Sequence, residues 1–136
     1  MCESFDSESF DKAIVIDLLQ QVVEHLDLAR KSFGVVTEVN FFSSSHIGKE
    51  KLASICMFLM VVGEQIKKID KLTNGVLLSK YPDIEWRRIM TFRNIVAHDY
   101  VHIDSEIVYN ICANEIEPLL NTVNQIIDEL EIEPPC

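Results

Sequence analysis

The segment "FRNIVAHDYVH", residues 92–102, gathers side chains that can do chemistry, among them Arg93, Asn94, His98 and Tyr100. Histidine exchanges a proton near neutral pH. Arginine presents a planar fork of donors that fits phosphate and stabilises developing negative charge. An asparagine can orient a phosphate oxygen or the histidine. Because a base can deprotonate an RNA 2′-hydroxyl for attack on the adjacent phosphate, histidine and arginine together suffice for RNA cleavage without a metal.

The spacing inside this segment leaves two arrangements open. On a regular helix each residue turns by about 100°, so Asn94 and His98 share a face. Arg93 and His98 are offset by about 140° and do not lie side by side on such a helix. Either the helix ends near His98 and leaves the imidazole room to turn, or the two side chains meet their counterparts across the axis of a symmetric dimer.

A purely structural interpretation stands beside the chemical one. A histidine near a helix C-terminus is favoured by the helix macrodipole, and Asp99 can pair with Arg93 or with a lysine. The other histidines, His25, His46 and His102, are expected to be structural or surface residues. Spacing alone does not decide between the chemical and the structural interpretation, because an arginine and a histidine five residues apart recur often by chance.

The elements that must position the segment are predicted to be helices. Apolar residues at steps of three and four indicate a first helix from Ser9, with Ser9 and Asp11 as candidate N-caps and Gly34 as its stop. A second helix is predicted over about 49–72, and Asn74-Gly75 ends it. Its first half is apolar on most sides, which is typical of a helix that is buried or paired with another chain.

Two further helices are predicted in the second half of the chain. The third follows the breaker Pro82, starts near Asp83 as a candidate N-cap and carries the segment of interest. The last begins after Asp104-Ser105 and runs to about Leu130. It contains Pro118, which removes one backbone hydrogen bond, so we expect a kink there.

Between the first and second helices, residues 35–47 are expected to form a loop or a short extra helix, with Phe41 and Phe42 anchored on the bundle. Tyr81 and Trp86 are expected to pack the third helix against it. No strand is predicted, so the fold class is all-α, a mainly antiparallel bundle of four to five helices with a kinked last helix. The chain is divided into a loose N-terminus, one helical domain and a tail, over residues 1–8, 9–131 and 132–136.

The charge and hydropathy of the chain argue against several classes of partner and location. The 136 residues carry a formal net charge of −10, which argues against a protein that mainly grips long nucleic acid, and we expect no DNA partner. The longest apolar run, residues 53–63, is about half the length needed to span a bilayer, so no membrane partner is expected. The acidic start "MCESFDSESFDK" does not resemble a signal peptide, and the expected location is cytoplasmic.

The four cysteines, Cys2, Cys56, Cys112 and Cys136, have no metal-ligand spacing, so neither a metal site nor a structural disulfide is expected. Cys56 and Cys112 fall in apolar helical patterns and are predicted to be buried thiols. Positive charge gathers at two places, which are Lys67, Lys68 and Lys71, and then Arg87, Arg88 and Arg93.

The motif "RNIVAHDY" at 93–100 resembles the Rx4HxY signature of the HEPN superfamily, and specifically of the HepT-like toxins of bacteria and archaea. "GEQIKKID" at 63–70 is similar to the Gly-Glu-bearing second helix of that family. "YPDIEWRRIMTFRNIVAHDY" at 81–100 is similar to its Tyr-Pro, Ile-x-Trp and Arg-Asn-x-x-x-His-Asp-Tyr run, and "IEPLL" at 116–120 to its proline-bearing last helix. The resemblance covers roughly residues 12–130.

This resemblance implies a HEPN-type bundle that forms a symmetric homodimer, with the two motifs facing each other across a cleft. It implies a metal-independent endoribonuclease without a cofactor, the toxin of a type VII toxin–antitoxin system. Arg93 and His98 would be the catalytic pair and Asn94 the polar residue beside them. The partner would be a minimal nucleotidyltransferase (MNT) antitoxin of the MntA kind, which transfers AMP from ATP to Tyr100. A bulky anion there would block the cleft and repel RNA.

The candidate RNA contacts beyond the motif are Lys67, Arg87 and Arg88, although exposed helix charges are usually only solvated. Two other hypotheses remain. In one, the chain is a non-catalytic helical dimer that binds a nucleotidyltransferase partner and is modified by it, with residues 93–100 as the docking epitope. In the other, it is a purely structural helical dimer.

Overall fold

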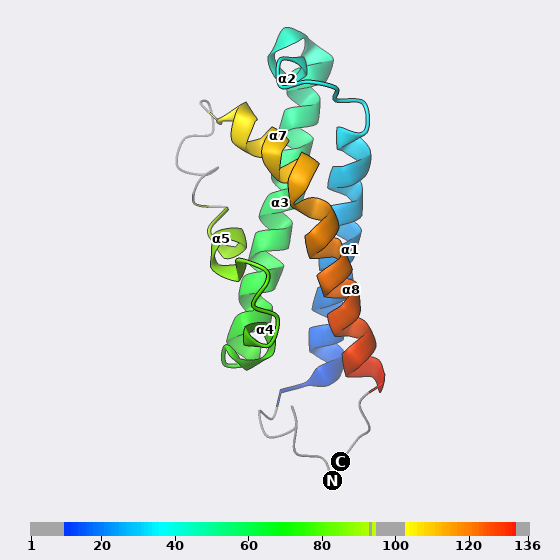
Figure 1. Cartoon of the computed structure of the whole chain (residues 1–136), viewed down its shortest axis with the longest axis vertical. Helices are drawn as coiled ribbons and strands as arrows, with labels where there is room; N and C mark the ends of the chain where they lie inside the picture. The colour runs from blue at the N-terminus through cyan, green and yellow to red at the C-terminus, as the bar shows by residue number, and fades with distance from the viewer. Residues whose placement is uncertain (1–9, 93, 95–102, 133–136) are drawn as a thin grey trace.

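The computed structural model describes residues 10–92, 94 and 103–132, and every regular element in these residues is a helix (Figure 1). This confirms the predicted all-α class. The described part holds seven helical segments, more than the four to five expected, because the chain adds short helices and divides the last one. They are α1 Lys12–Phe33, α2 Phe41–Ser44, α3 His46–Leu72, α4 Val76–Ser79, α5 Trp86–Met90, α7 Ser105–Asn114 and α8 Ile116–Ile132.

The three long helices form the body of the molecule. α1 packs against both α3 and α8 and runs antiparallel to them, as the colour gradient of Figure 1 shows. α2 packs on α3 at one end of the bundle, and α4 lies near the opposite end. α5 and α7 both lie against α3, so that helix supports the elements on either side of residues 93–102.

The core of the bundle follows the apolar periodicity of its helices. In α1 the buried side chains recur at steps of three and four, namely Val15, Leu18, Leu19, Val22, Leu26 and Ala29. Cys56 of α3 is buried and Cys112 of α7 is half-buried, and both are thiols rather than disulfide partners. Burial raises the pKa of Cys56 to about 11 and that of Cys112 to about 12. Cys56 is therefore a core thiol, as predicted, whereas Cys112 is only partly buried and packs against the core.

The first two long helices begin at side-chain caps. Asp11 accepts hydrogen bonds from the backbone N–H groups of Ala13 at 3.0 Å and Ile14 at 3.2 Å, which confirms one of the two predicted caps of α1. α3 begins at His46, a few residues before its predicted start. Ser45 explains the difference, because its hydroxyl accepts from the N–H of Gly48 at 3.1 Å.

The third helix was predicted to start near Asp83, and this is wrong: α5 starts at Trp86. The preceding residues form a turn that the indole closes, because the Nε1–H of Trp86 donates to the carbonyl of Tyr81 at 2.9 Å. Trp86 is buried, and the Tyr81 hydroxyl donates to the carboxylate of Glu129 on α8. The predicted packing roles of Tyr81 and Trp86 are thus confirmed.

The predicted last helix is interrupted. α7 ends at Asn114 and α8 starts at Ile116, with Glu115 between them. Pro118 accounts for the interruption, because it has no N–H to donate to the carbonyl four residues earlier, at Asn114. The carbonyl of Glu115 still accepts from the N–H of Leu119 at 3.2 Å. The expected kink therefore takes the form of a break between two helices.

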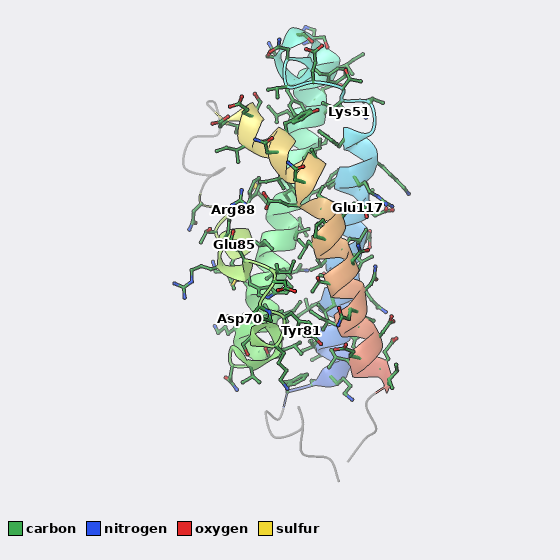
Figure 2. All side chains as sticks on the ribbon, viewed as in Figure 1. Lys51, Asp70, Tyr81, Glu85, Arg88 and Glu117 are labelled. Atoms are coloured by element: carbon green, nitrogen blue, oxygen red, sulfur yellow. The ribbon has the colours of Figure 1, made fainter. Side chains whose placement is uncertain are left out.

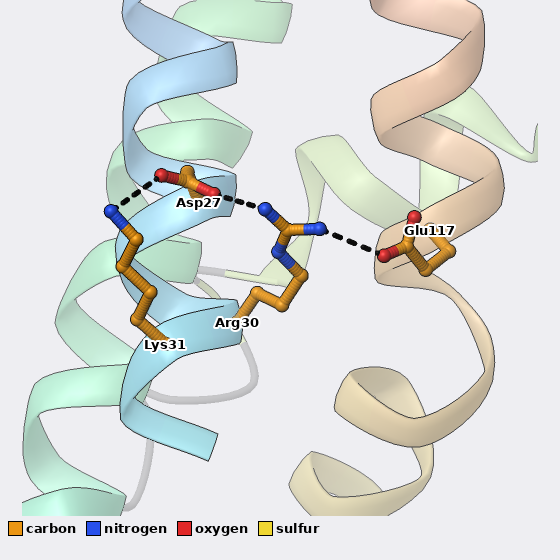
Figure 3. Close-up of polar contacts among 4 residues, drawn as sticks. All are labelled: Asp27, Arg30, Lys31 and Glu117. Atoms are coloured by element: carbon orange, nitrogen blue, oxygen red, sulfur yellow. Dashed lines mark hydrogen bonds and ion pairs between the residues drawn. The ribbon is translucent and has the colours of Figure 1, made fainter. Parts of the chain in front are cut away.

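An ion-pair network ties the end of α1 to the start of α8 (Figure 3). The Arg30 guanidinium lies 2.5 Å from an Asp27 carboxylate oxygen on its own helix and 3.1 Å from a Glu117 carboxylate oxygen on α8. Lys31 lies 3.1 Å from the other oxygen of Asp27. Hydrogen bonds from Arg30 and Lys31 lower the pKa of Asp27. Since the charged ends are solvent-exposed, the network orients the two helices more than it stabilises them.

Among the helices that the structure describes, none combines the length and the apolar character that crossing a membrane requires.

Candidate active site

Most of the residues predicted to carry out the chemistry lie outside the part of the chain that the structure describes. Arg93, His98 and Tyr100 are not among them, so the two arrangements derived for Arg93 and His98 stay predictions. Asn94 is described. It is helical and exposed, and its N–H donates to the carbonyl of Thr91 at 2.9 Å. The residue predicted to assist the arginine is therefore exposed on the surface of the described part of the chain.

The chain enters the motif through α5 and a buried aromatic anchor. α5 ends at Met90, where Thr91 caps it and its hydroxyl donates to the carbonyl of Arg88 at 3.0 Å. Phe92 then inserts into the core with 6% of its surface exposed. Two residues later Asn94 faces solvent, so the boundary between core and accessible surface passes through the start of the motif.

Gly63 allows α5 to approach α3 closely. A Cβ built on Gly63 would lie 2.7 Å from the carbonyl oxygen of Ile89, which is closer than real Cβ contacts allow. The backbone of α5 therefore rests on the bare backbone of α3 just before the motif. The sequence interpretation noted this glycine only as part of a family resemblance and missed its role. The available signal was a glycine inside a long apolar helix, which indicates a close packing contact.

The chain leaves the motif through a second cap. Asp104 accepts hydrogen bonds from the N–H groups of Glu106 at 2.9 Å and Ile107 at 3.3 Å, which confirms its predicted role at the start of α7. Ile103 is half-buried and packs against the core. The residues that flank the motif are thus fixed on both sides, Phe92 and Ile103 by the core and Asp104 by its cap on α7.

The three candidate RNA contacts differ in their surroundings. Lys67 on α3 and Arg87 on α5 are exposed. Arg88 is also exposed, but its guanidinium lies 2.5 Å from a carboxylate oxygen of Glu115 at the junction of α7 and α8. That contact raises the pKa of Arg88. The charge of Arg88 is largely offset by Glu115, so this residue is the least suited of the three to bind phosphate.

Two of the three histidines outside the motif, His25 and His46, are described by the structure. His25 is half-buried on α1, with Nδ1 2.8 Å from the carbonyl oxygen of Gln21 and its ring near that of Phe58. His46 is exposed at the start of α3, a helical position where a loop was expected. His102 lies outside the described residues. Over the part of the chain that is described, no three His, Cys, Asp or Glu side chains gather in a way that could hold a metal ion.

Comparison with known proteins places these observations in a family. The family model described as "Ribonuclease HepT-like" matches residues 31–126, which is most of the chain and includes the whole motif. The chain is also 24% identical over 122 residues to a protein of Methanocaldococcus jannaschii named "Putative RNase MJ0127". That match covers 90% of this chain and 91% of the relative. No solved structure matches the chain significantly.

Proposed function

We propose that this chain, which belongs to the Ribonuclease HepT-like family, is a metal-independent endoribonuclease and the toxin of a type VII toxin–antitoxin system. The observation that carries the proposal is the Arg-Asn-x-x-x-His-Asp-Tyr motif at 93–100, which lies inside the region that the family model matches. The accessible amide of Asn94, next to a buried anchor at Phe92, supports a reaction centre at the surface of this bundle.

In the proposed reaction, His98 takes the proton from an RNA 2′-hydroxyl. The 2′-oxygen forms a bond to the adjacent phosphorus and the bond from phosphorus to the 5′-oxygen breaks. A protonated histidine returns a proton to the leaving 5′-oxygen, so the products are a 2′,3′-cyclic phosphate and a 5′-hydroxyl. Arg93 stabilises the charge on the phosphate oxygens and Asn94 orients one of them.

A homodimer suits this chemistry. On a regular helix, Arg93 and His98 would lie on different faces. A two-fold axis through the motif would bring Arg93 of one chain close to His98 of the other. Two histidines would then share the cleft, one to accept a proton and one to donate it. The test is the oligomeric state in solution, together with mixing of Arg93→Ala and His98→Ala chains. The mixed dimer keeps one arginine and one histidine, so partial activity above that of either parent variant supports residues shared across the axis.

The proposed regulator is a cognate nucleotidyltransferase antitoxin. The Tyr100 hydroxyl would attack the α-phosphorus of ATP, forming a tyrosyl-AMP ester and releasing pyrophosphate. The ester places a bulky anion two residues from His98, which would fill the cleft and repel the RNA backbone.

The deciding experiment combines intact mass with RNA cleavage. We expect the purified chain to cut RNA in EDTA and His98→Ala to reduce cleavage at least about a hundredfold, as expected for loss of a general base. Incubation with the neighbouring nucleotidyltransferase and ATP should add whole AMP units and abolish cleavage, and Tyr100→Phe should gain no mass. An unchanged rate in His98→Ala would contradict the nuclease assignment.

A second function has support from the charge distribution. The chain carries a net charge of −10, and Arg88 is already paired with Glu115. Both features suit a non-catalytic helical dimer that docks a nucleotidyltransferase and is modified by it. Stable complex formation without RNA cleavage by the unmodified chain would favour this alternative.

A further inference from the structure

A cavity of about 500 Å³ opens beside α5, and the described residues that line it come from all three long helices, from α5 and α7 and from the turn before α5. Its volume falls within the range of roughly 300–1,000 Å³ that is typical of small-molecule sites. It lies between α3, α5 and the junction of α7 and α8.

The inner part of this cavity is apolar and rigid. Leu26, Leu59 and Val62 come from the two longest helices and are buried in the core, so they form a fixed floor. Ile111 of α7 and Phe92 add apolar walls. The break at Glu115 turns α7 away from the axis of α8 (Figure 1), and residues of both helices line the cavity. Such a surface binds a ligand through the release of water from apolar groups.

The outer part of the cavity is acidic. Among the described residues, the charged lining groups are three carboxylates, Asp83, Glu85 and Glu115, and one guanidinium, that of Arg88. Arg88 pairs with Glu115 and also lies in the field of Glu85, so it offsets one of these three negative charges and the described rim stays negative overall. Figure 2 shows Glu85 and Arg88 together on the side of α5. A positively charged group at this rim is attracted, and an anion is repelled.

We propose that this cavity is a binding site for a small cationic amphiphile, a molecule with an apolar body and an ammonium head. The body would rest on the floor of Leu26, Leu59 and Val62, and the ammonium would reach Asp83 and Glu85 at the rim. Binding here would use none of the catalytic groups proposed for RNA cleavage, although Phe92 and Ile89 line the cavity just before Arg93.

The lining supplies its own reporters, because five of its residues are isoleucines, Ile84, Ile89, Ile107, Ile111 and Ile116. We would label the Ile δ1 methyl groups of the full chain and titrate 4-phenylbutylammonium, 4-phenylbutan-1-ol and 4-phenylbutanoate, which share one body. The phenyl ring should shift these five methyl signals saturably and leave those of Ile14, Ile55 and Ile126 unchanged. We expect the ammonium to bind about tenfold more tightly than the carboxylate, because the rim charge favours one and opposes the other.

Variants separate the two parts of the site. Ile111→Trp should fill the cavity and abolish binding of all three probes. The pair Asp83→Asn and Glu85→Gln should remove the preference for the ammonium and leave the affinity of the alcohol unchanged. Asp128→Asn, an exposed acid on α8 away from the cavity lining, should keep the preference and serves as the matched control.

Several results would overturn the proposal. Equal affinities for the three probes would refute the acidic rim, and unsaturable shifts would refute the site. Methyl shifts that follow protein concentration rather than ligand concentration would assign the cavity to a second copy of the chain. If Ile111→Trp does not fold, the two rim substitutions still decide the question. No step uses RNA, so failure here and failure of the nuclease proposal are distinguishable.

Discussion

Gly63 has more effect on the placement of the motif than its lack of a side chain suggests. The carbonyl of Ile89 occupies the space that a Cβ would need, so any larger residue pushes α5 away from α3. Phe92 and Asn94 follow directly, and a shift of α5 passes to them through a few peptide units. Among the described residues, Gly63 is therefore a positioning residue for the proposed nuclease centre, although it carries no chemistry itself.

We predict that Gly63→Ala destabilises the chain by about 1–2 kcal/mol, because overpacking against backbone outweighs the better helix propensity of alanine. RNA cleavage should fall as well, since α5 must move. Gly34→Ala is the matched control, because Gly34 has an ordinary φ of −58° and its added Cβ would lie 3.2 Å from the carbonyl oxygen of Lys31 in the last turn of α1, touching no other helix. It should change stability by less than about 0.5 kcal/mol. Urea unfolding measures the stability of the two variants, and RNA cleavage rates measure their activity. Equal effects of the two substitutions would contradict the close contact at Gly63.

Single residues show where sequence reasoning succeeded and where it failed. Asp11 and Asp104 were predictable as caps because capping depends on residue type and local chain direction. The role of Gly63 was not, because a close approach is a property of two helices that meet. The pairing of Arg88 with Glu115 joins residues far apart in sequence and was missed for the same reason.

At the scale of elements, periodicity identified the long helices but not the short ones or every boundary. α1 and α3 were predictable because each buries a repeating apolar face. α5 starts later than predicted because a tertiary hydrogen bond from the Trp86 indole shapes the preceding turn. α4 has only four residues, which is too short to show a helical period. Pro118 predicted a kink in one last helix, and the structure instead has a break between α7 and α8, because the form of the distortion depends on where neighbouring carbonyls find donors.

The caps of α1 and α7 provide a matched pair of predictions at this scale. Each aspartate accepts two backbone N–H groups, so Asp11→Ala and Asp104→Ala should each cost about 1 kcal/mol in the free energy of unfolding. Asp104 also fixes the end of residues 93–102, and Asp11 does not. Cleavage by the folded protein should therefore fall in Asp104→Ala and stay unchanged in Asp11→Ala. Thermal unfolding and initial cleavage rates check this, and equal activities would show that the α7 cap does not restrain the motif.

At the scale of the whole molecule, the charge and the proposed substrate are in conflict. The net charge of −10 repels RNA at long range, whereas the proposed contacts at Arg93, Lys67 and Arg87 attract it at short range. Most nucleic-acid-binding proteins lose affinity as salt rises, because their basic surfaces release counterions. In this protein, added salt should first weaken the long-range repulsion between RNA and the acidic surface, because salt screens distant charges more than charges in close contact.

We therefore predict that the association rate of the chain with a short RNA rises about two- to fivefold between 10 and 150 mM salt, as the Debye length falls from about 30 Å to about 8 Å. The pair Asp128→Asn and Glu131→Gln removes two exposed acids from α8 and should flatten this rise by increasing the rate at low salt. Stopped-flow fluorescence with His98→Ala as the inactive background measures binding without cleavage. A rate that falls steadily with salt in both proteins would mean that local basic contacts dominate, and the acidic exterior would then have no part in selecting the RNA.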